Sequence, residues 1–519
     1  MSLDPAALQV LIARLSGVAA EMGAVLQRAA FSPNIKERAD CSAAVFDASG
    51  QLLAQAEHIP VHLGSMPASV AAVLARFAAD PLRPGEQAVV NDPYAGGTHL
   101  NDVTVVAPCH VDGRLVGYVA NRAHHADLGG AAPGSLPADA TDIAQEGLRL
   151  PPVRLTPDVR ALIVASSRTP AERAGDLDAQ LGANVVGGAR LAALDGAPFA
   201  EVLDYGERRV LAALRALGAG EWSAADRLDS TGPRPDQQHP AWIRCRISST
   251  GHAITFDFTG TDPQSTGNMN AVEAVTVSCV AFALRSALDP SLPANAGVMR
   301  RVRTVALPGT LVAARFPAAV GAGNVEVSQR IADVCLRAFA DAVPHRVGAG
   351  SQGTMNNVII GGRTNVAGDD EPWVYYETIG GGQGGRPDGR AGMSGVHTGM
   401  TNTRNTPIEA VERAYPLRVR RQTLCRGSGG AGDAPGGDGI DRAIELLADA
   451  TVSLITERRV SSPSGLGGGE SGAAGENELA PADGSPARPT SDKTTVDLHA
   501  GDVLHVRTPG GGGWGLTDR

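Results

Sequence analysis

The chain of 519 residues is poor in aromatic side chains and in signals for export or membrane insertion. Aromatic residues make up 4% of it, so Ala, Val and Leu are expected to build most of the core. No apolar run approaches the roughly 20 residues that span a bilayer. The N-terminus has no basic segment followed by a short apolar core, so no signal peptide is predicted. We therefore expect a cytoplasmic protein without a membrane partner.

Paired cysteine motifs and a phosphate-binding loop are also missing. The six cysteines form no CxxC pair, and several lie in apolar runs such as VSCVAFAL, which favours buried free thiols in a reducing compartment. The sequence contains no GxxxxGK[ST] motif, and its GGGQGG run lacks the strand–GxGxxG–helix context of a dinucleotide-binding fold. This chain on its own is therefore not expected to hydrolyse ATP.

The charge and the length set further limits. A formal net charge of -10 argues against a nucleic-acid partner, because such proteins normally present a basic face. A hydrophobic content of 43% is ordinary for a globular protein, and 519 residues exceed what one core usually holds. The composition is that of a soluble enzyme with two to four domains.

What the chain does have is a stretch rich in potential metal ligands, from Asn91 to Asp127. Two strands are predicted within it, over 103–111 and 115–120, and Asp112-Gly113 between them is a strong hairpin signal. Because a hairpin brings its two ends together, the polar residues before the first strand should meet those after the second. These residues are Asp92, His99 and Asp102 on one side and His124, His125 and Asp127 on the other.

The spacing predicts that His99, Asp102 and His124 share one metal ion. Two imidazoles and a carboxylate suit zinc, manganese or iron(II), with positions left for water or substrate. The absence of a thiolate favours manganese or a catalytic zinc. His125 should point away from His124, because side chains alternate along an extended segment. The alternative, which the spacing leaves open, is a set of hydrogen-bonded turn residues without a metal.

Hairpins, helices and strands follow one another without a regular βαβ rhythm, so we expect an α+β fold that is mixed and multi-domain. Several antiparallel hairpins and a helical middle segment are predicted. Helices are expected over 5–26, 67–77, 157–220, 271–288 and 324–342, and strands over 42–46, 52–54, 242–247, 253–258, 311–316, 415–426, 440–446 and 450–456. The proposed regions are an N-terminal metal-site region (1–155), a helical segment (156–225), an α/β region (226–347), a Gly/Asn-rich active-site loop region (348–425) and a C-terminal β-rich region (426–519).

Glycine is abundant, with 64 residues, and it concentrates in the second half of the chain. The segment 348–405 is predicted as a polar loop that lays its backbone close to a ligand. Residues 461–489 are interpreted as a loop or linker, and 495–506 as a last hairpin. The terminal PGGGGWG is interpreted as a glycine turn anchored by its Trp.

Several long motifs then resemble one family. The runs HIPVHLGSMP, NDPYAGGTHLNDV, ANRAHHADLGGAAPGSLP, IAQEGLRLPP and TPGGGGWG are similar to those of the hydantoinase B/oxoprolinase family, over nearly the whole chain. That family includes subunits of ATP-dependent N-methylhydantoinases, 5-oxoprolinases, caprolactamases and acetone carboxylases. The resemblance implies a chain that works with a hydantoinase A-type ATP-binding subunit, in a hetero-oligomer such as (AB)2.

The resemblance also implies a chemistry. The partner uses ATP to phosphorylate a carbonyl oxygen of a cyclic amide, such as a hydantoin, 5-oxoproline or another lactam. This chain, holding one divalent metal (manganese or zinc, with iron a third option) at His99, Asp102 and His124, hydrolyses the activated amide. Candidates for base or orienting roles are Asp92, His62, His125 and Glu146. The alternatives are a subunit of an ATP-dependent ketone carboxylase and a non-catalytic scaffold for the ATPase.

Overall fold

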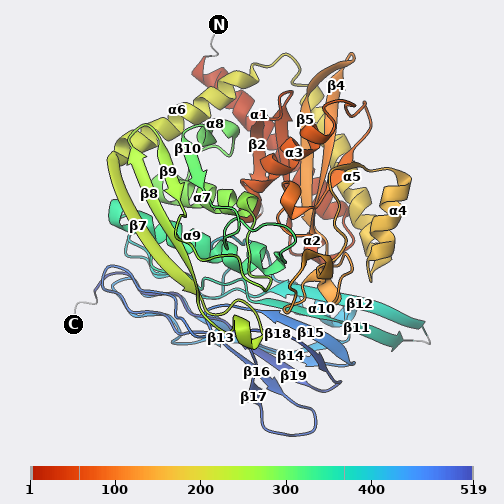
Figure 1. Cartoon of the computed structure of the whole chain (residues 1–519), viewed down its shortest axis with the longest axis vertical. Coiled ribbons are helices and arrows are strands. Elements are labelled where there is room, and N and C mark those ends of the chain that lie inside the picture. The colour runs from red at the N-terminus through yellow and green to blue at the C-terminus, as the bar shows by residue number, and fades with distance from the viewer. Residues whose placement is uncertain (1–3, 58, 367–368, 517–519) are drawn as a thin grey trace.

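The N-terminal part of the protein is built on one antiparallel sheet. The computed structural model describes residues 4–57, 59–366 and 369–516. The sheet has the strand order β2-β1-β5-β4-β3-β6, and its strands β2, β5 and β4 are labelled in the red and orange part of Figure 1. Its strands are β1 (Cys41–Asp47), β2 (Leu52–Glu57), β3 (Ala88–Val90), β4 (Asp102–Val111), β5 (Arg114–His124) and β6 (Val153–Arg154). The predicted hairpins β1–β2 and β4–β5 are confirmed.

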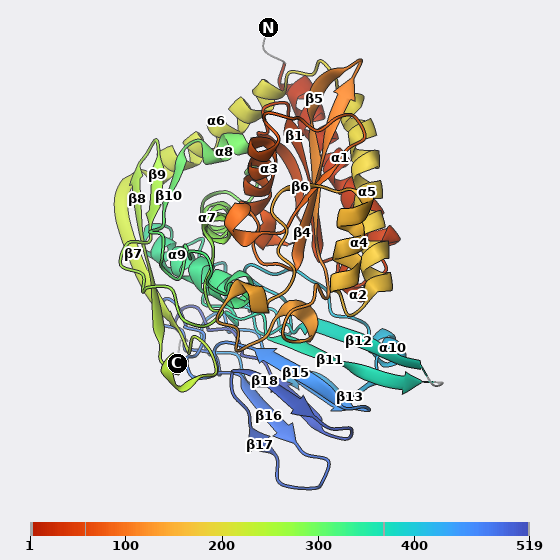
Figure 2. The same cartoon turned by 45° about the vertical axis from the view of Figure 1, so that its right-hand side comes forward.

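Helices cover both faces of this sheet (Figure 2). On one face, Ala43 and Val45 pack with α1 (Pro5–Ala29) and α5 (Pro170–Ala192). On the other, Ala44 and Phe46 pack with α3 (Ser65–Arg76). The alternation follows from the two-residue repeat of a strand. In the described part of the chain, α1 alone is long and apolar enough to cross a membrane; its apolar face packs against β1, β2 and α5, as the core helix of a soluble protein also does.

The middle of the chain contains the predicted helices together with a second sheet. Its helices are α4 (Pro157–Ser166), α5, α6 (Phe199–Leu217), α7 (Glu273–Leu288), α8 (Ala296–Met299) and α9 (Ser328–Ala342). The sheet runs β10-β9-β8-β7, from β7 (Ala219–Leu228), β8 (Ala241–Thr250), β9 (Ile254–Asp257) and β10 (Val302–Val305). A π-helical turn, Gly323–Val327, lies directly before α9. The strand predicted over 311–316 is wrong. Leu311 and Val312 lie in a turn, and their apolar side chains are buried.

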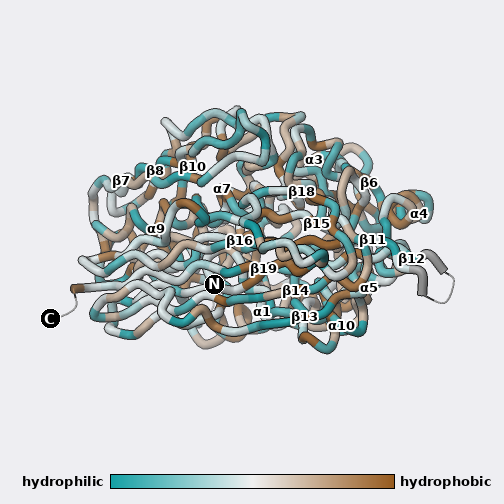
Figure 3. Tube along the Cα trace, turned by 90° about the horizontal axis from the view of Figure 1, so that it is seen from below, coloured by the Kyte–Doolittle hydropathy of each residue, from teal (hydrophilic) through white to brown (hydrophobic). Residues whose placement is uncertain are grey.

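The C-terminal part is a layer of two further sheets. One has the order β12-β11-β15-β18 and the other β13-β14-β19-β16-β17. The strands are β11 (Asn357–Val366), β12 (Asp369–Thr378), β13 (Leu417–Cys425), β14 (Gly439–Leu446), β15 (Ala450–Ile455), β16 (Glu476–Ala480), β17 (Arg488–Pro489), β18 (Lys493–Leu498) and β19 (Val503–Arg507), with the short helix α10 (Ile408–Ala414) before β13. Figure 3 shows β13, β14, β16 and β19 on the underside of the molecule.

Three predictions for this layer are wrong. The supposed loop 348–405 contains the long hairpin β11–β12, and the supposed linker 461–489 contains β16 and β17. The last two strands do not form a hairpin, because β18 pairs with β15 while β19 pairs with β14 and β16. The turn between them passes from one sheet to the other. The strand predicted over 415–426 is confirmed as β13, which lies at the edge of its sheet.

Beside these sheets, glycine segments pack directly against each other's backbones. We call this the glycine layer; it comprises residues 380–385, 429–437, 464–472 and 509–515. Gly385 N donates to Gly512 O, and Gly430 N donates to Gly511 O, both over 2.8 Å. A Cβ on Gly385 would lie 2.0 Å from Ala434 O. The glycines thus allow close backbone packing within the protein, and the terminal PGGGGWG is an extended member of this layer and no simple turn.

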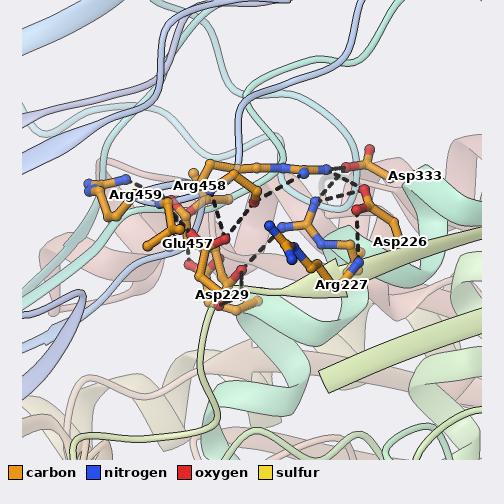
Figure 4. Close-up of polar contacts among 12 residues, drawn as sticks. Asp226, Arg227, Asp229, Asp333, Glu457, Arg458 and Arg459 are labelled. Carbon is orange, nitrogen blue, oxygen red and sulfur yellow. Dashed lines mark hydrogen bonds and ion pairs between the residues drawn. The ribbon is translucent and has the colours of Figure 1, made fainter. Parts of the chain in front are cut away.

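A buried ion network joins the middle sheet to the C-terminal layer (Figure 4). Arg458 Nη2 lies 2.7 Å from Asp226 Oδ2 on β7, and Arg330 Nη2 on α9 lies 3.2 Å from Glu457 Oε2. Lys493 Nζ approaches Glu457 Oε1 to 2.7 Å. The network therefore links β7, α9 and the C-terminal layer, which are far apart in sequence. The protein is α+β, with mixed helices and several antiparallel sheets in more than one domain.

Candidate metal centre

The hairpin β4–β5 brings the predicted ligands together, as its sequence requires. Asp112 and Gly113 take φ values of 49° and 78°, the left-handed pair of a tight two-residue turn. A register shift between Cys109 and His110 then moves the pairing by one residue, so that Asp102 lies directly opposite His124 at the open end of the hairpin. His99 reaches the same place through the turn before β4, where Asp102 N donates to His99 O.

The three side chains form a compact, buried cluster. His99 Nε2 lies 3.1 Å from His124 Nδ1, and the two Nδ1 atoms each lie 3.5 Å from an oxygen of Asp102. One ligand atom from each residue can be chosen so that all lie within 4.8 Å of one another. The side chains are at most 3% exposed. This is the spacing expected of residues that surround one metal ion.

The hydrogen bonding of the cluster is incomplete, which fits a metal site. His99 Nδ1 and His124 Nε2 are buried and have no hydrogen-bond partner, and such orphaned atoms are rare in folded proteins. Burial lowers the pKa of His99 to about 3, against the pull of Asp102. Burial opposes ionisation of Asp102, but His99 and His62 hold its pKa well below the usual value. A neutral imidazole and an ionised carboxylate are the forms that bind metals.

Other side chains orient the carboxylate of Asp102. Thr98 Oγ1 donates to Asp102 Oδ2 over 2.5 Å, and Asn324 Nδ2 lies 3.4 Å from the same oxygen. His62 Nε2 also lies 3.4 Å from it, while His62 Nδ1 lies 2.9 Å from Ser42 Oγ. His62 was identified from sequence, whereas Thr98, Ser42 and Asn324 were not.

The remaining candidates from the sequence have their polar contacts elsewhere. His125 turns to the opposite face, where Nε2 lies 2.9 Å from Gln180 Oε1 on α5; burial and then Arg173 lower its pKa to about 4. Asp92 accepts from Tyr94 N and lies 3.6 Å from Arg149. Glu146 accepts from the backbone of Val320 and Gly321, and burial raises its pKa to about 8.

Fold and site together define a class: an α+β protein with a buried His–Asp–His cluster suited to a metal. The sequence model for "Hydantoinase B/oxoprolinase" matches residues 4–517, so the chain belongs to the hydantoinase B/oxoprolinase family. It is 40% identical to an uncharacterised protein of Methanocaldococcus jannaschii, over 99% of this chain and 91% of that protein.

Two further relatives carry functional names. The chain is 37% identical to 5-oxoprolinase 1 of Arabidopsis thaliana, over 99% of this chain but only 42% of that protein. The crystal structure of the ATP-dependent caprolactamase from Pseudomonas jessenii has a TM-score of 0.89 and 26% sequence identity, and the match covers 99% of this chain and 92% of that one. The likeness to this structure extends over the whole described fold.

Proposed function

We propose that this chain is the metal-bearing subunit of an ATP-dependent cyclic amide hydrolase. The observation that carries the proposal is the incomplete His99–Asp102–His124 cluster, found in a chain of this family. An amide is a poor electrophile, and phosphorylation of its oxygen by an ATP-binding partner makes the carbon easier to attack. A hydantoin, 5-oxoproline or another lactam is the proposed substrate, and its ring amide is the bond that is hydrolysed.

The share of 5-oxoprolinase 1 that this chain covers supports a separate ATP-binding partner. The chain spans about two fifths of 5-oxoprolinase 1, and the sequence has no phosphate-binding loop. We therefore assign ATP use to a separate hydantoinase A-type subunit, in a hetero-oligomer such as (AB)2. The similar caprolactamase from Pseudomonas jessenii is ATP-dependent, which is consistent with this division.

Within the site, His99, Asp102 and His124 would hold one divalent metal, which we propose to be manganese or zinc. When bound, such an ion supplies Lewis acidity and makes water a better nucleophile near neutral pH. His62 is the best-placed residue for proton movement, because Nε2 faces Asp102 Oδ2 and Nδ1 is fixed against Ser42. Roles for Asp92, His125 and Glu146 stay predictions.

The test is reconstitution with a hydantoinase A-type partner, ATP and a panel of hydantoin, 5-oxoproline and caprolactam. We expect ring opening of one of them, and no ATP hydrolysis by this chain alone. His99→Ala should abolish both turnover and bound metal. His110→Ala, on the same strand β4 but at its far end, is the matched control and should keep both. Bicarbonate-dependent carbon–carbon bond formation instead of ring opening would overturn the hydrolase proposal.

A further inference from the structure

The imidazole of His124 rests on an aromatic ring from the C-terminal layer. Tyr376 on β12 stacks on it with the ring centroids 4.8 Å apart and the planes 19° from parallel. Both side chains are buried. A ligand from the N-terminal sheet is therefore supported by a residue from a different sheet.

The ring of Tyr376 is itself held in place. The guanidinium of Arg38 lies 4.8 Å from its centroid, and Arg38 donates to Tyr376 O and Thr378 Oγ1, both over 2.9 Å. At the other end, Tyr376 Oη donates to Asn357 Oδ1 over 2.9 Å. With contacts to its face, backbone and hydroxyl, the ring has little freedom to rotate.

The turn that carries Arg38 also holds the backbone of His124. Two residues further on, Asp40 O accepts from His124 N over 3.0 Å. Ala39, between them, has a φ of 56°, in the left-handed region that is unfavourable by roughly 1–2 kcal/mol for a residue with a Cβ. Such a conformation persists only where the surroundings impose it. One short turn thus fixes both the main chain of His124 and, through Tyr376, its imidazole.

We propose that Tyr376, clamped by Arg38, is a positioning residue for the metal ligand His124. Its ring presents the imidazole in one orientation before any metal arrives, so metal affinity depends on the docking of β12 against the N-terminal sheet. Residues that orient a metal ligand through hydrogen bonds typically contribute roughly 10- to 100-fold to metal affinity, and we expect an effect of this size from the stacked ring. This inference rests on the proposed metal centre.

Tyr375 offers a matched control on the same strand. It is also buried, but it points to the opposite face of β12, where its hydroxyl contacts Glu377 and Arg442. We would measure Co²⁺ binding to the full chain by visible absorption in competition with a chelator. Tyr376→Leu should raise the Co²⁺ Kd about 10- to 100-fold and change the absorption bands. Tyr376→Phe, which keeps the ring, should stay within about threefold, and Tyr375→Leu should lower the Tm without changing Kd or spectrum.

The outcomes separate the positioning role from the metal centre itself. A folded Tyr376→Leu variant with wild-type Kd and spectrum would overturn the positioning role, as would a Tyr375→Leu variant that loses as much affinity. If wild-type protein binds no Co²⁺, the metal centre fails, and this inference with it. Should Tyr376→Leu not fold, Arg38→Met provides the measurement: it removes the clamp but keeps the ring, and it should weaken Co²⁺ binding several-fold. An unchanged Kd there would likewise overturn the inference.

Discussion

Two buried clusters of titratable side chains in this protein differ in how they satisfy their charges. In the ion network, each of Asp226, Asp333 and Glu457 has a cationic partner, and the cations come from three different parts of the chain. In the metal cluster, the single carboxylate of Asp102 faces the imidazoles, and buried ring nitrogens are left without a partner.

The difference supports a structural role for the ion network and is consistent with the proposed metal site. The ion network also leaves Arg330 Nε and Arg458 Nε without a hydrogen-bond partner, but its carboxylates are paired with cations, and removing one partner leaves an uncompensated charge. In the metal cluster, buried ring nitrogens without a partner are unfavourable, and a bound ion would satisfy them. The contrast leads to opposite responses to mutation and to metal.

The largest effect is expected from Arg330→Ala. Arg330 is fully buried and contacts Asp226, Asp333 and Glu457. Its loss should lower the free energy of unfolding by about 3–5 kcal/mol, because each of the three carboxylates loses one of its cationic partners and the buried network is left with excess negative charge. Urea denaturation measures this. Arg337→Ala is the control: its side chain is 45% exposed and 3.7 Å from Asp226, so its loss should change stability by about 1 kcal/mol or less. Equal losses in the two variants would contradict the structural role of the network.

The metal cluster should behave in the opposite way, gaining stability from an added ion. With Mn²⁺ or Zn²⁺ at roughly 100 times its Kd, the free energy of unfolding should rise by about 2.7 kcal/mol. Asp102→Asn should lose this metal-dependent gain, since it removes the only carboxylate of the cluster. Thermal unfolding with and without the ion measures the difference. Asp92→Asn, in the same stretch but bonded to Tyr94, should keep the gain; if it does not, the ligand assignment is wrong.

Glu146 is a buried carboxyl that accepts hydrogen bonds from the backbone amides of Val320 and Gly321. Burial raises its pKa from 4.5 to about 8 in the folded protein. The folded state therefore holds this proton more tightly, and its contribution to stability is present below pH 4.5 and lost as the pH rises through 8. The slope from this group approaches about 1.4 kcal/mol per pH unit within that window.

Glu146→Gln stays neutral, so its stability relative to wild type should increase from about pH 5 to about pH 8 in unfolding experiments. Glu86→Gln is the control with the opposite sign. Hydrogen bonds from Arg83 N and Arg154 lower the pKa of that exposed carboxyl, so its contribution is lost as the pH falls. A pH-independent difference between wild type and Glu146→Gln would mean that Glu146 is ionised in the folded protein.

The part of the site that could be predicted from sequence is the part built by local structure. His99, Asp102 and His124 lie close together because an Asp-Gly turn forms the hairpin and a register shift between Cys109 and His110 pairs Asp102 with His124. The choice of His124 over His125 followed from strand alternation, and His125 does contact α5 on the other face. Local patterns of this kind indicate the strands and the hairpin that joins them, but not the register shift between Cys109 and His110.

What could not be predicted depends on partners far along the chain. Tyr376 and Asn324 reach the cluster from β12 and from the π-helical turn before α9, and no local pattern marks them. Strand periodicity indicated β18 and β19 but not that they join different sheets. From the sequence alone, the glycines at 510–513 suggest a turn. Glycine shows that another part of the protein can pack close to this backbone, but the sequence does not reveal which segments do so.

The smallest effect concerns the strained turn behind the metal cluster. Ala39→Gly relieves the left-handed φ of 56°, a gain partly offset by the greater freedom of glycine in the unfolded chain, so stability should rise by about 0.5–1 kcal/mol. The same freedom loosens the turn that directs Arg38 and Asp40, so Co²⁺ affinity should fall by about two- to threefold. Asp112 has a left-handed φ of 49° in the β4–β5 turn. Asp112→Gly should therefore change stability without changing Co²⁺ affinity. If stability and metal affinity rise together in Ala39→Gly, the strain at residue 39 does not serve the metal cluster.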